Sequence, residues 1–300
     1  MKDLKIVNGR IPDFENDSWI HTDILIHEGK IEKVGNVTEE CKQVIDAEGK
    51  IVSPGFIDIH SHEDEFVGNK EDDFFTAGRG LLMGVTTEIL GNCGDNYNPI
   101  ETLVERVERD GAPINLMTFV GQNYLRELAG ADDRYKAATK EQLDKMKIAL
   151  SGLRKYQPVG ISCGFEYAPG VTTEETIELT KALEEEGYLI AVHFRQDGPQ
   201  APDSTRELIE ISKATGYGIE MSHIGSCSAV GYMKETLDII KDARESGVDI
   251  SADCYPYCAF CTGIGTAVFD DGCFDRWGKT YSDILVLDGR FVYQRCSNVI

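Results

Sequence analysis

The fold is decided by residues 53–62, which read SPGFIDIHSH. A Pro-Gly turn precedes a short apolar run, 55–59, which predicts a buried strand, and two histidines follow it directly. His60 and His62 are two residues apart, so in an extended chain both imidazoles point to the same side and can hold one cation. Such a pair alone is weak evidence for a metal site, and its position at the end of a strand strengthens it.

From residue 51 onward, short apolar runs alternate with helical stretches. Because no glycine-rich nucleotide loop follows any of these runs, the alternation favours an α/β fold of the TIM type, a (β/α)8 barrel, over an open nucleotide-binding sheet. No eighth strand precedes residue 300, so we expect a barrel that is incomplete here, with strand eight missing. The seven predicted strands are 55–59, 85–90, 114–120, 159–163, 189–192, 219–222 and 248–252.

The first fifty residues have a different pattern. Short alternating runs separated by glycine turns predict a small β domain, and Asn8-Gly9 predicts a tight turn that ends its first strand. We therefore predict two domains, a small β domain at 1–54 and the barrel at 55–300. The 54-residue unit is expected to be one half of a composite β-sandwich.

Acidic residues outnumber basic residues by 52 to 30, which gives a net charge of −22. A surface of this charge repels phosphate backbones and anionic membranes, so neither nucleic acid nor membrane is an expected partner. No secretory signal is visible, and nine scattered cysteines favour reduced thiols in the cytoplasm. Cys258 and Cys261 form a C-x-x-C pair without a second pair, and we interpret them as small core or loop residues.

The residues that carry chemistry stand at the ends of predicted strands. His193 ends the fifth strand, His223 ends the sixth, and Cys93 follows the second within GNCG. In a β/α barrel the carboxyl ends of the strands form the catalytic face. Taken singly, each of these three residues fits an ordinary core position. All three are expected on the same face of the barrel as His60 and His62, and this favours a common zinc site. Asp58 either supports this site by hydrogen bonding or faces a turn.

Together these motifs resemble the amidohydrolase superfamily, and within it the D-aminoacylase (N-acyl-D-amino acid deacylase) branch. Residues 84–94, which read GVTTEILGNCG, carry most of the resemblance, and 163–170 and 253–257 add to it. The resemblance implies a hydrolase that uses zinc to cleave a linear amide, with an N-acyl-D-amino acid as its small-molecule substrate.

The resemblance also implies a set of metal ligands. Cys93, His193 and His223 would form a tight zinc site, and His60 and His62 would form a weaker second site that shares Cys93. Other branches carry a bridging carboxylated lysine near 163–166, where this chain has none. That difference fits a bridging role for the thiolate of Cys93.

Several positions bear on the substrate and on catalysis. Tyr167 and Tyr255 match tyrosines that the branch uses around the substrate, and the alternative is that they are ordinary loop aromatics. The family's catalytic Asp follows strand eight, and 268–300 resembles an insertion before that strand, so we expect the Asp beyond Ile300. Gly225 stands where relatives often carry a lysine that pairs with the substrate carboxylate, and Gln122 stands where a histidine is frequent.

Two alternatives stay open. The chain could be another amidohydrolase, such as a cyclic amidase or a dipeptidase. Alternatively it could be a non-catalytic metal-binding fragment, because we expect a longer enzyme to be needed for strong zinc binding and turnover. The sequence indicates neither the acyl and amino acid preference nor the oligomeric state.

Overall fold

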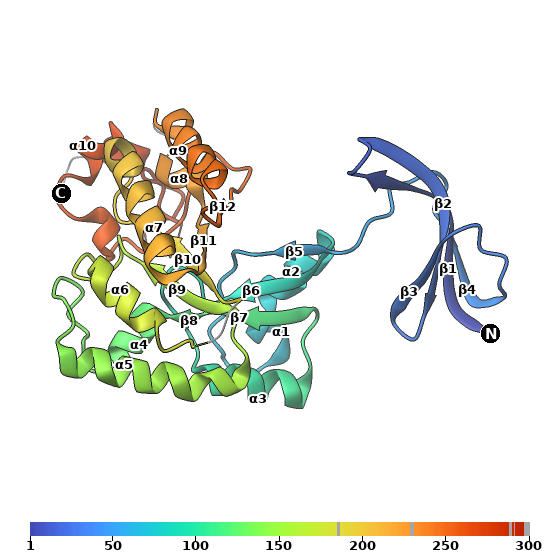
Figure 1. Ribbon diagram of the computed structural model, residues 1–300, viewed down its shortest axis with the longest axis horizontal. Helices are drawn as coiled ribbons and strands as arrows, with labels where there is room; N and C mark the ends of the chain where they lie inside the picture. Colours follow the sequence, from blue (N-terminus) through green and yellow to red (C-terminus); the bar gives the residue numbers. More distant parts are fainter. Residues whose placement is uncertain (185–186, 229–230, 288–289, 291, 297–300) are drawn as a thin grey trace. The chain divides into compact units, whose positions relative to one another are not determined.

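The computed structural model of the protein describes residues 1–184, 187–228, 231–287, 290 and 292–296 (Figure 1). The chain divides into two compact units, Met1–Phe56 and Ile57–Ile300. The division into domains at 1–54 and 55–300 stays a prediction, and the residues that end the second domain, 297–300, lie outside the described residues.

The first unit is a four-stranded sheet with the order β3-β2-β1-β4. β1 pairs antiparallel with β2 and parallel with β4, so the chain must cross over before β4 joins the sheet. The strands are β1 Lys2–Asp13, β2 Ser18–His27, β3 Lys30–Gly35 and β4 Cys41–Asp46.

The prediction of a turn at Asn8-Gly9 is wrong. β1 continues through both residues, and its register with β2 shifts between Ile6 and Gly9, which is the sign of a β-bulge. Asn8 has φ 58°, a left-handed conformation that asparagine accepts more readily than most residues. A Cβ on Gly9 would lie 2.8 Å from Cγ2 of Val52. Asn-Gly dipeptides favour hairpin turns, but in this chain Asn8-Gly9 bends a continuous strand.

The second unit has parallel strands in the order in which they occur in the sequence. One sheet has the order β5-β6-β7 and another β8-β9-β10-β11-β12. β7 and β8 are separated by Phe119, whose N–H bonds to the carbonyl of Leu90, so the predicted strand 114–120 is split in two. The strands are β5 Phe56–Asp58, β6 Val85–Leu90, β7 Asn115–Thr118, β8 Val120–Gly121, β9 Gly160–Gly164, β10 Leu189–His193, β11 Gly218–Met221 and β12 Ile250–Ala252.

This sequential parallel order agrees with the predicted α/β class. Within the described part of the chain, β5 forms one edge of the smaller sheet and β12 forms one edge of the larger sheet, and the two strands do not pair with each other. Closure of a barrel and the absence of strand eight therefore stay predictions.

The prediction that 55–59 forms a buried strand is wrong for the part of the chain that the structure describes. Phe56 and Ile57 in β5 are 60% and 63% exposed. β5 is an edge strand with β6 as its neighbour, and side chains on an edge strand are buried only where another element covers them.

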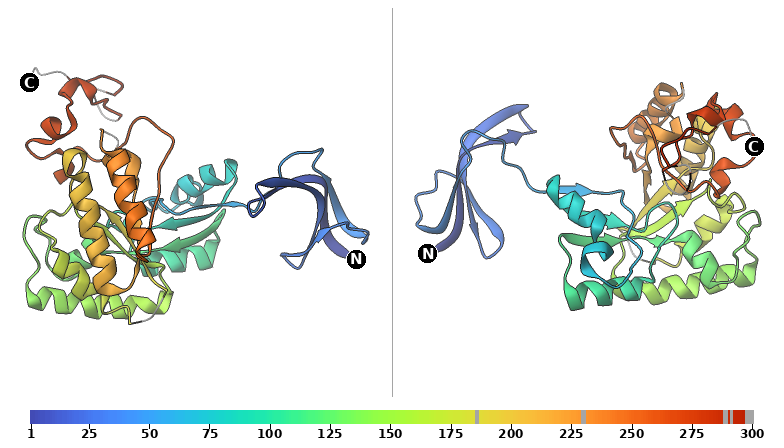
Figure 2. Two further views of the ribbon diagram at one scale, coloured as in Figure 1. Left: turned by 45° about the horizontal axis from the view of Figure 1, so that its top comes forward. Right: turned by 180° about the vertical axis from the view of Figure 1, so that it is seen from behind.

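Helices cover the larger sheet along its length (Figures 1 and 2). α4 packs on α5, α5 on α6, α6 on α7, and α7 on α9, so successive helices are neighbours as in a β/α barrel. Every residue of β9 and β11 is buried, as expected for parallel strands covered on both faces. The α-helices are α1 Lys70–Asp73, α2 Phe75–Leu82, α3 Ile100–Asp110, α4 Gln122–Leu128, α5 Lys140–Leu153, α6 Thr173–Thr180, α7 Ala201–Thr215, α8 Ile224–Ser228, α9 Met233–Glu245 and α10 Cys273–Trp277.

The described residues also include short turns of 3-10 helix: η1 Arg154–Tyr156, η2 Gly198–Gln200, η3 Ala267–Phe269 and η4 Tyr281–Asp283. Among the described residues, none of the helices is both long enough and apolar enough to cross a bilayer.

Candidate metal centre

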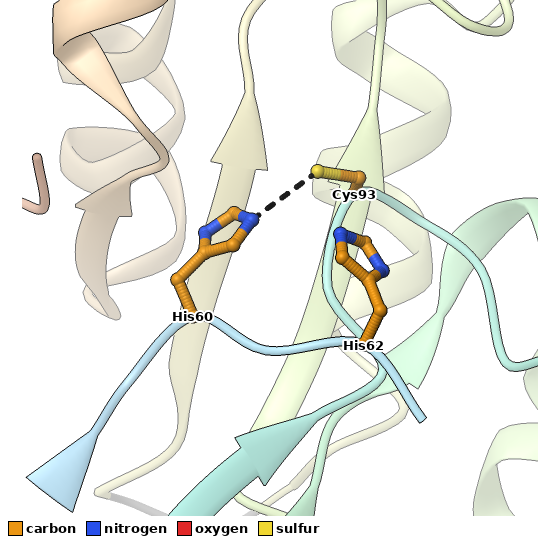
Figure 3. Close-up of side chains that lie close together, drawn as sticks. All are labelled: His60, His62 and Cys93. Atoms are coloured by element: carbon orange, nitrogen blue, oxygen red, sulfur yellow. Dashed lines mark hydrogen bonds between the residues drawn. The ribbon is translucent and has the colours of Figure 1, made fainter. Parts of the chain in front are cut away.

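The five side chains predicted as metal ligands come together at the carboxyl ends of the strands. They fall into two groups within which the ligand atoms lie no more than 4.8 Å apart. One group is His60, His62 and Cys93, and the other is Cys93, His193 and His223. Figure 3 shows the first group, with both imidazoles on one side of the loop after β5 and the sulfur opposite them. Cys93 belongs to both groups and therefore lies between them.

The distances within these groups suit zinc. The Sγ of Cys93 lies 3.5 Å from Nε2 of His60 and 3.4 Å from Nε2 of His223. Zinc bonds to thiolate at about 2.3 Å and to imidazole at about 2.0 Å, so two such ligands of one tetrahedral ion lie about 3.5 Å apart. Nitrogen and sulfur donors at this separation are the ligand set that zinc prefers.

Two of the predicted ligands have an unusual backbone conformation. Cys93 has φ 56° and His223 has φ 37°, both in the left-handed region, which costs a non-glycine residue on the order of 1–3 kcal/mol. The Cys93 loop is fixed by close backbone contacts on both sides. A Cβ on Gly164 would lie 2.0 Å from the carbonyl oxygen of Cys93, and one on Gly121 would lie 2.2 Å from that of Gly94. The surrounding glycines therefore hold the thiol in place.

Hydrogen bonds orient two of the imidazoles. The Nδ1–H of His60 donates to Oδ2 of Asp253 over 2.9 Å, and Nδ1 of His223 lies 2.9 Å from Oγ of Ser226. In each ring Nε2 is then left to face Cys93. The other carboxylate oxygen of Asp253 accepts the backbone N–H of His223 over 2.7 Å, so one carboxylate fixes residues that follow two different strands.

His193 is oriented in the opposite sense. Its Nε2 bonds to Oε2 of Glu166 over 2.9 Å, and its buried Nδ1 has no hydrogen-bond partner among the described residues. A buried polar atom without a partner needs an explanation, and a cation shared with Cys93 and His223 supplies one. A carboxylate on the distal nitrogen of a ligand histidine is a common arrangement in metal sites.

The roles of Glu166 and Asp253 are not predicted from the sequence. Both residues lie just past the carboxyl end of a strand, Glu166 after β9 and Asp253 directly after β12. Position at the carboxyl end of a strand, the signal that predicts the histidines, could therefore also have indicated Glu166 and Asp253. For Asp58 the sequence leaves two roles open, and in the structure its Oδ1 accepts the backbone N–H of His60 over 3.0 Å. It thus supports the turn of the chain and not the imidazole.

The electrostatics of the site favour the neutral form of His62, His193 and His223. Burial lowers the pKa of His62 to about 4 and that of His193 to about 3, and it lowers the pKa of His223 well below its usual value. Neutral imidazole is the form that binds a metal. Burial raises the pKa of the Cys93 thiol far above its usual value, so a thiolate here needs a cation beside it.

A cavity of about 450 Å³ opens onto the five predicted ligands, a size common for small-molecule sites. Tyr167 and Tyr255, the tyrosines predicted at the substrate, both line it. The ring of Tyr167 packs edge-on against His193 with a centroid separation of 4.6 Å, and its hydroxyl bonds to Thr262. Further lining residues are Asp58, Glu166, Asp197, Ser226, Cys227, Tyr257, Ala259, Phe260, Cys261, Thr262 and Val268.

Three other positions from the sequence analysis do not join the ligand groups. Gln122 is buried, and its side chain bonds to Glu175 and Thr176, which is a structural role. Cys258 and Cys261 are exposed, as expected of loop residues, and neither belongs to a potential metal-binding group within the described residues.

Comparison with known proteins identifies similar enzymes. The chain is 29% identical to a D-aminoacylase of Alcaligenes xylosoxydans xylosoxydans in an alignment of 288 positions that covers 87% of this chain and 58% of that enzyme. It is 28% identical to an N-acyl-D-glutamate deacylase of the same organism, covering 85% of this chain and 57% of that enzyme. The chain thus spans less than two thirds of the length of these relatives. No profile of a known protein family matches the chain.

Solved structures give the same result. A D-aminoacylase whose structure defines a subset of amidohydrolases has a TM-score of 0.76 and 26% identity, covering 86% of this chain and 59% of its own. An N-acyl-D-glutamate deacylase from Bordetella bronchiseptica, solved with zinc and a phosphonate mimic of the tetrahedral intermediate, has a TM-score of 0.73 and 28% identity, covering 85% and 59%. The resemblance to the D-aminoacylase branch of the amidohydrolase superfamily is confirmed.

Proposed function

We propose that this chain supplies the metal centre of a zinc-dependent amidohydrolase that deacylates an N-acyl-D-amino acid, giving a carboxylate and a D-amino acid. The observation that carries the proposal is the position of the Cys93 thiol. Its Sγ lies 3.5 Å from Nε2 of His60 in one ligand group and 3.4 Å from Nε2 of His223 in the other. The relatives support the substrate class, because they include a D-aminoacylase and deacylases of N-acyl-D-glutamate and N-acyl-D-aspartate.

The two groups differ in how strongly we expect them to bind zinc. Cys93, His193 and His223 are all buried, and they offer one thiolate and two neutral imidazoles, so we assign the tight site to them. His60 and His62 are more exposed and depend on the shared sulfur of Cys93 for a third ligand, so we assign a weaker site to them. A binuclear metal centre in a related D-aminoacylase supports two sites.

The chain's own residues would bind and orient the amide beside this centre. Bound zinc supplies an acidified water and polarises a carbonyl. Burial raises the pKa of Tyr167 above its usual value, so its hydroxyl stays protonated and can donate a hydrogen bond to the substrate. Tyr255 lies on the cavity wall as a second donor. The catalytic Asp expected beyond Ile300 stays a prediction.

Metal content and substrate choice test the proposal. We expect the purified chain to bind one zinc per molecule more tightly than a second, so that a chelator removes the second zinc first, and we expect a form extended through an eighth strand to hold both more tightly. Hydrolysis would be compared for N-acetyl-D-amino acids, their L-isomers and cyclic amides, for this chain and for a form extended through an eighth strand with its Asp. We expect the D-isomers to be preferred, and the extended form to be far more active.

Other outcomes would favour the alternatives. A chain that binds no zinc when Cys93 is reduced would contradict the proposal at its base. Preference for a cyclic amide or a dipeptide would indicate another amidohydrolase activity. Zinc binding without hydrolysis of any amide, in the extended form as well, would favour a non-catalytic metal-binding protein.

A further inference from the structure

A series of polar contacts leads from His193 to α10, a segment far from it in the sequence. We propose that Arg276 in α10 is a positioning residue: it holds Glu166 against Nε2 of His193 and thereby directs Nδ1 of that ring toward the metal. This inference rests on the proposed metal centre, and it adds a residue that neither the ligand motifs nor the cavity tyrosines include.

The contacts are specific. Oε2 of Glu166 accepts from Nε2 of His193 over 2.9 Å, and its Oε1 accepts from Nη2 of Arg276 over 3.3 Å. Nε of the same guanidinium forms an ion pair with Asp197 at 3.5 Å. The indole N–H of Trp277, the next residue, donates to the other oxygen of Asp197. Arg276 thus lies between two carboxylates, one of which touches a predicted ligand.

Burial explains why these carboxylates need a cation. The side chains of Glu166 and Asp197 are 7% and 8% exposed, and that of Arg276 is 23% exposed. A buried carboxylate without a partner is costly, and two of them near one another repel as well. The guanidinium neutralises both and fixes their directions, because its planar fork constrains where each carboxylate can lie.

The direction of Glu166 determines which nitrogen of His193 is available. A carboxylate at Nε2 keeps the proton on that nitrogen, and Nδ1 then keeps the lone pair that a metal requires. The buried Nδ1 has no hydrogen-bond partner among the described residues. If Glu166 were free to turn away, the ring could adopt the other tautomer, and the metal would lose a preorganised ligand.

The packing of α10 fixes Arg276 in turn. Trp277 is surrounded by Phe260, Phe269 and Phe274, at centroid separations of 5.8, 5.7 and 6.0 Å. Phe260 also lines the cavity, so this aromatic cluster forms part of the cavity wall. The orientation of a metal ligand and the shape of the substrate cavity therefore depend on the same segment.

The test compares Arg276→Gln with a matched control, Arg106→Gln. Arg106 also bridges two carboxylates, Asp73 and Asp110, at 2.5 Å each, and it is 13% exposed. Neither Arg106 nor its partners line the cavity of about 450 Å³. Removing either arginine costs a buried ion pair, so a loss of folding stability is expected in both variants and does not discriminate between them.

Zinc affinity does discriminate, measured by competition with a chromophoric chelator. We expect Arg276→Gln to weaken the tight site by about 10- to 100-fold, the range typical of lost outer-shell partners, and Arg106→Gln to leave it unchanged. Arg276→Lys, which keeps the charge, should recover part of the loss. Glu166→Gln should weaken zinc binding as Arg276→Gln does. It replaces Arg276→Gln in the test if that variant does not fold.

The absorption spectrum of the cobalt-loaded chain adds a readout that a purely structural role would not change. We expect the cobalt bands to shift in Arg276→Gln and to stay at the wild-type positions in Arg106→Gln. Equal losses of zinc affinity in Arg276→Gln and Arg106→Gln would overturn the inference and leave the metal centre intact. Wild-type zinc affinity and a wild-type cobalt spectrum in Arg276→Gln would do the same. Equal zinc binding by the wild type and Cys93→Ser would instead overturn the proposed metal centre, and this inference with it.

Discussion

At the scale of single residues, Cys93 combines two properties that conflict without a metal. Its side chain is buried, which favours the neutral thiol, and the four histidines of the two ligand groups offer ring nitrogens around it. Only the thiolate is a good zinc ligand. Metal binding must therefore remove a proton that burial would otherwise retain.

The first prediction concerns this proton. Because burial raises the pKa of Cys93 well above its usual value, zinc binding at about pH 6 should release close to one proton from the thiol. Affinity should then rise about tenfold for each pH unit. Calorimetry in buffers of different ionisation enthalpy measures the release. Cys93→Ser should bind zinc far more weakly and release no such proton, and a wild-type chain that releases none would contradict the expectation.

The second prediction concerns His62 in the metal-free chain. Burial lowers its pKa from 6.5 to about 4. At pH values between these two, the imidazole is protonated in the unfolded state and neutral in the folded state. Its contribution to stability is full above pH 6.5 and is lost as the pH falls toward 4. The loss reaches at most about 3 kcal/mol, at about 1.4 kcal/mol for each pH unit.

Urea unfolding of the metal-free wild type and His62→Gln, at pH 7 and pH 4.5, measures this difference. The variant should lose less stability between the two pH values, because Gln does not titrate. Since other buried groups titrate in both proteins alike, the comparison isolates His62. An identical pH dependence in the two proteins would show that this ring is not held in its neutral form.

At the scale of elements, β9 and the loop after β6 are in unusually close contact. A Cβ on Gly164, the last residue of β9, would lie 2.0 Å from the carbonyl oxygen of Cys93. The contact is with backbone, so a side chain there cannot simply turn aside. The position of the thiol thus depends on a residue that has no side chain.

The third prediction follows from this contact. Gly164→Ala should displace the Cys93 loop, weaken zinc binding by at least about tenfold and lower the free energy of unfolding by about 1–3 kcal/mol, as overpacking does. Gly152→Ala is the control, because a Cβ there meets nothing within 4 Å and lies within α5. It should leave zinc affinity unchanged and raise stability by about 0.5–1 kcal/mol. Wild-type zinc affinity in Gly164→Ala would contradict the role given to this glycine.

The same elements show what the sequence can predict. Apolar runs located the strands of the second unit to within a few residues, since a strand buried on both faces must be apolar throughout. They did not predict the split at Phe119, the bulge at Asn8 or the exposure of β5. Each of these depends on a neighbouring strand, and periodicity within one segment carries no information about that neighbour.

For the site, the histidines and Cys93 could be predicted as a group because strand ends in a barrel converge. Their partners could not be predicted in the same way. Asp253 meets His60 across 193 positions, and Arg276 meets Glu166 across 110. No local pattern predicts such a pair, because the sequence does not distinguish one acidic residue near a strand end from another. Only the packing of the folded chain determines which of them contacts the ligand.

At the scale of the whole molecule, all five predicted ligands lie in the unit Ile57–Ile300. They follow or end β5, β6, β10 and β11, so a bound metal would connect strands from the two sheets of that unit. In the unit Met1–Phe56, His21, His27 and Cys41 belong to none of the potential metal-binding groups found among the described residues. Metal binding should therefore act on the two units unequally.

The fourth prediction uses this difference. A ligand that binds only the folded state stabilises it by about 2.7 kcal/mol at a free concentration one hundred times its dissociation constant. Hydrogen exchange with and without zinc should show slower exchange at the loops after β5, β6 and β11, and unchanged exchange in β1 to β4. Cys93→Ser should remove the zinc effect, because its thiol is shared by both groups. Equal slowing in both units would indicate that zinc acts on the acidic surface in general, since the chain carries a net charge of −22, and not through the five converging ligands.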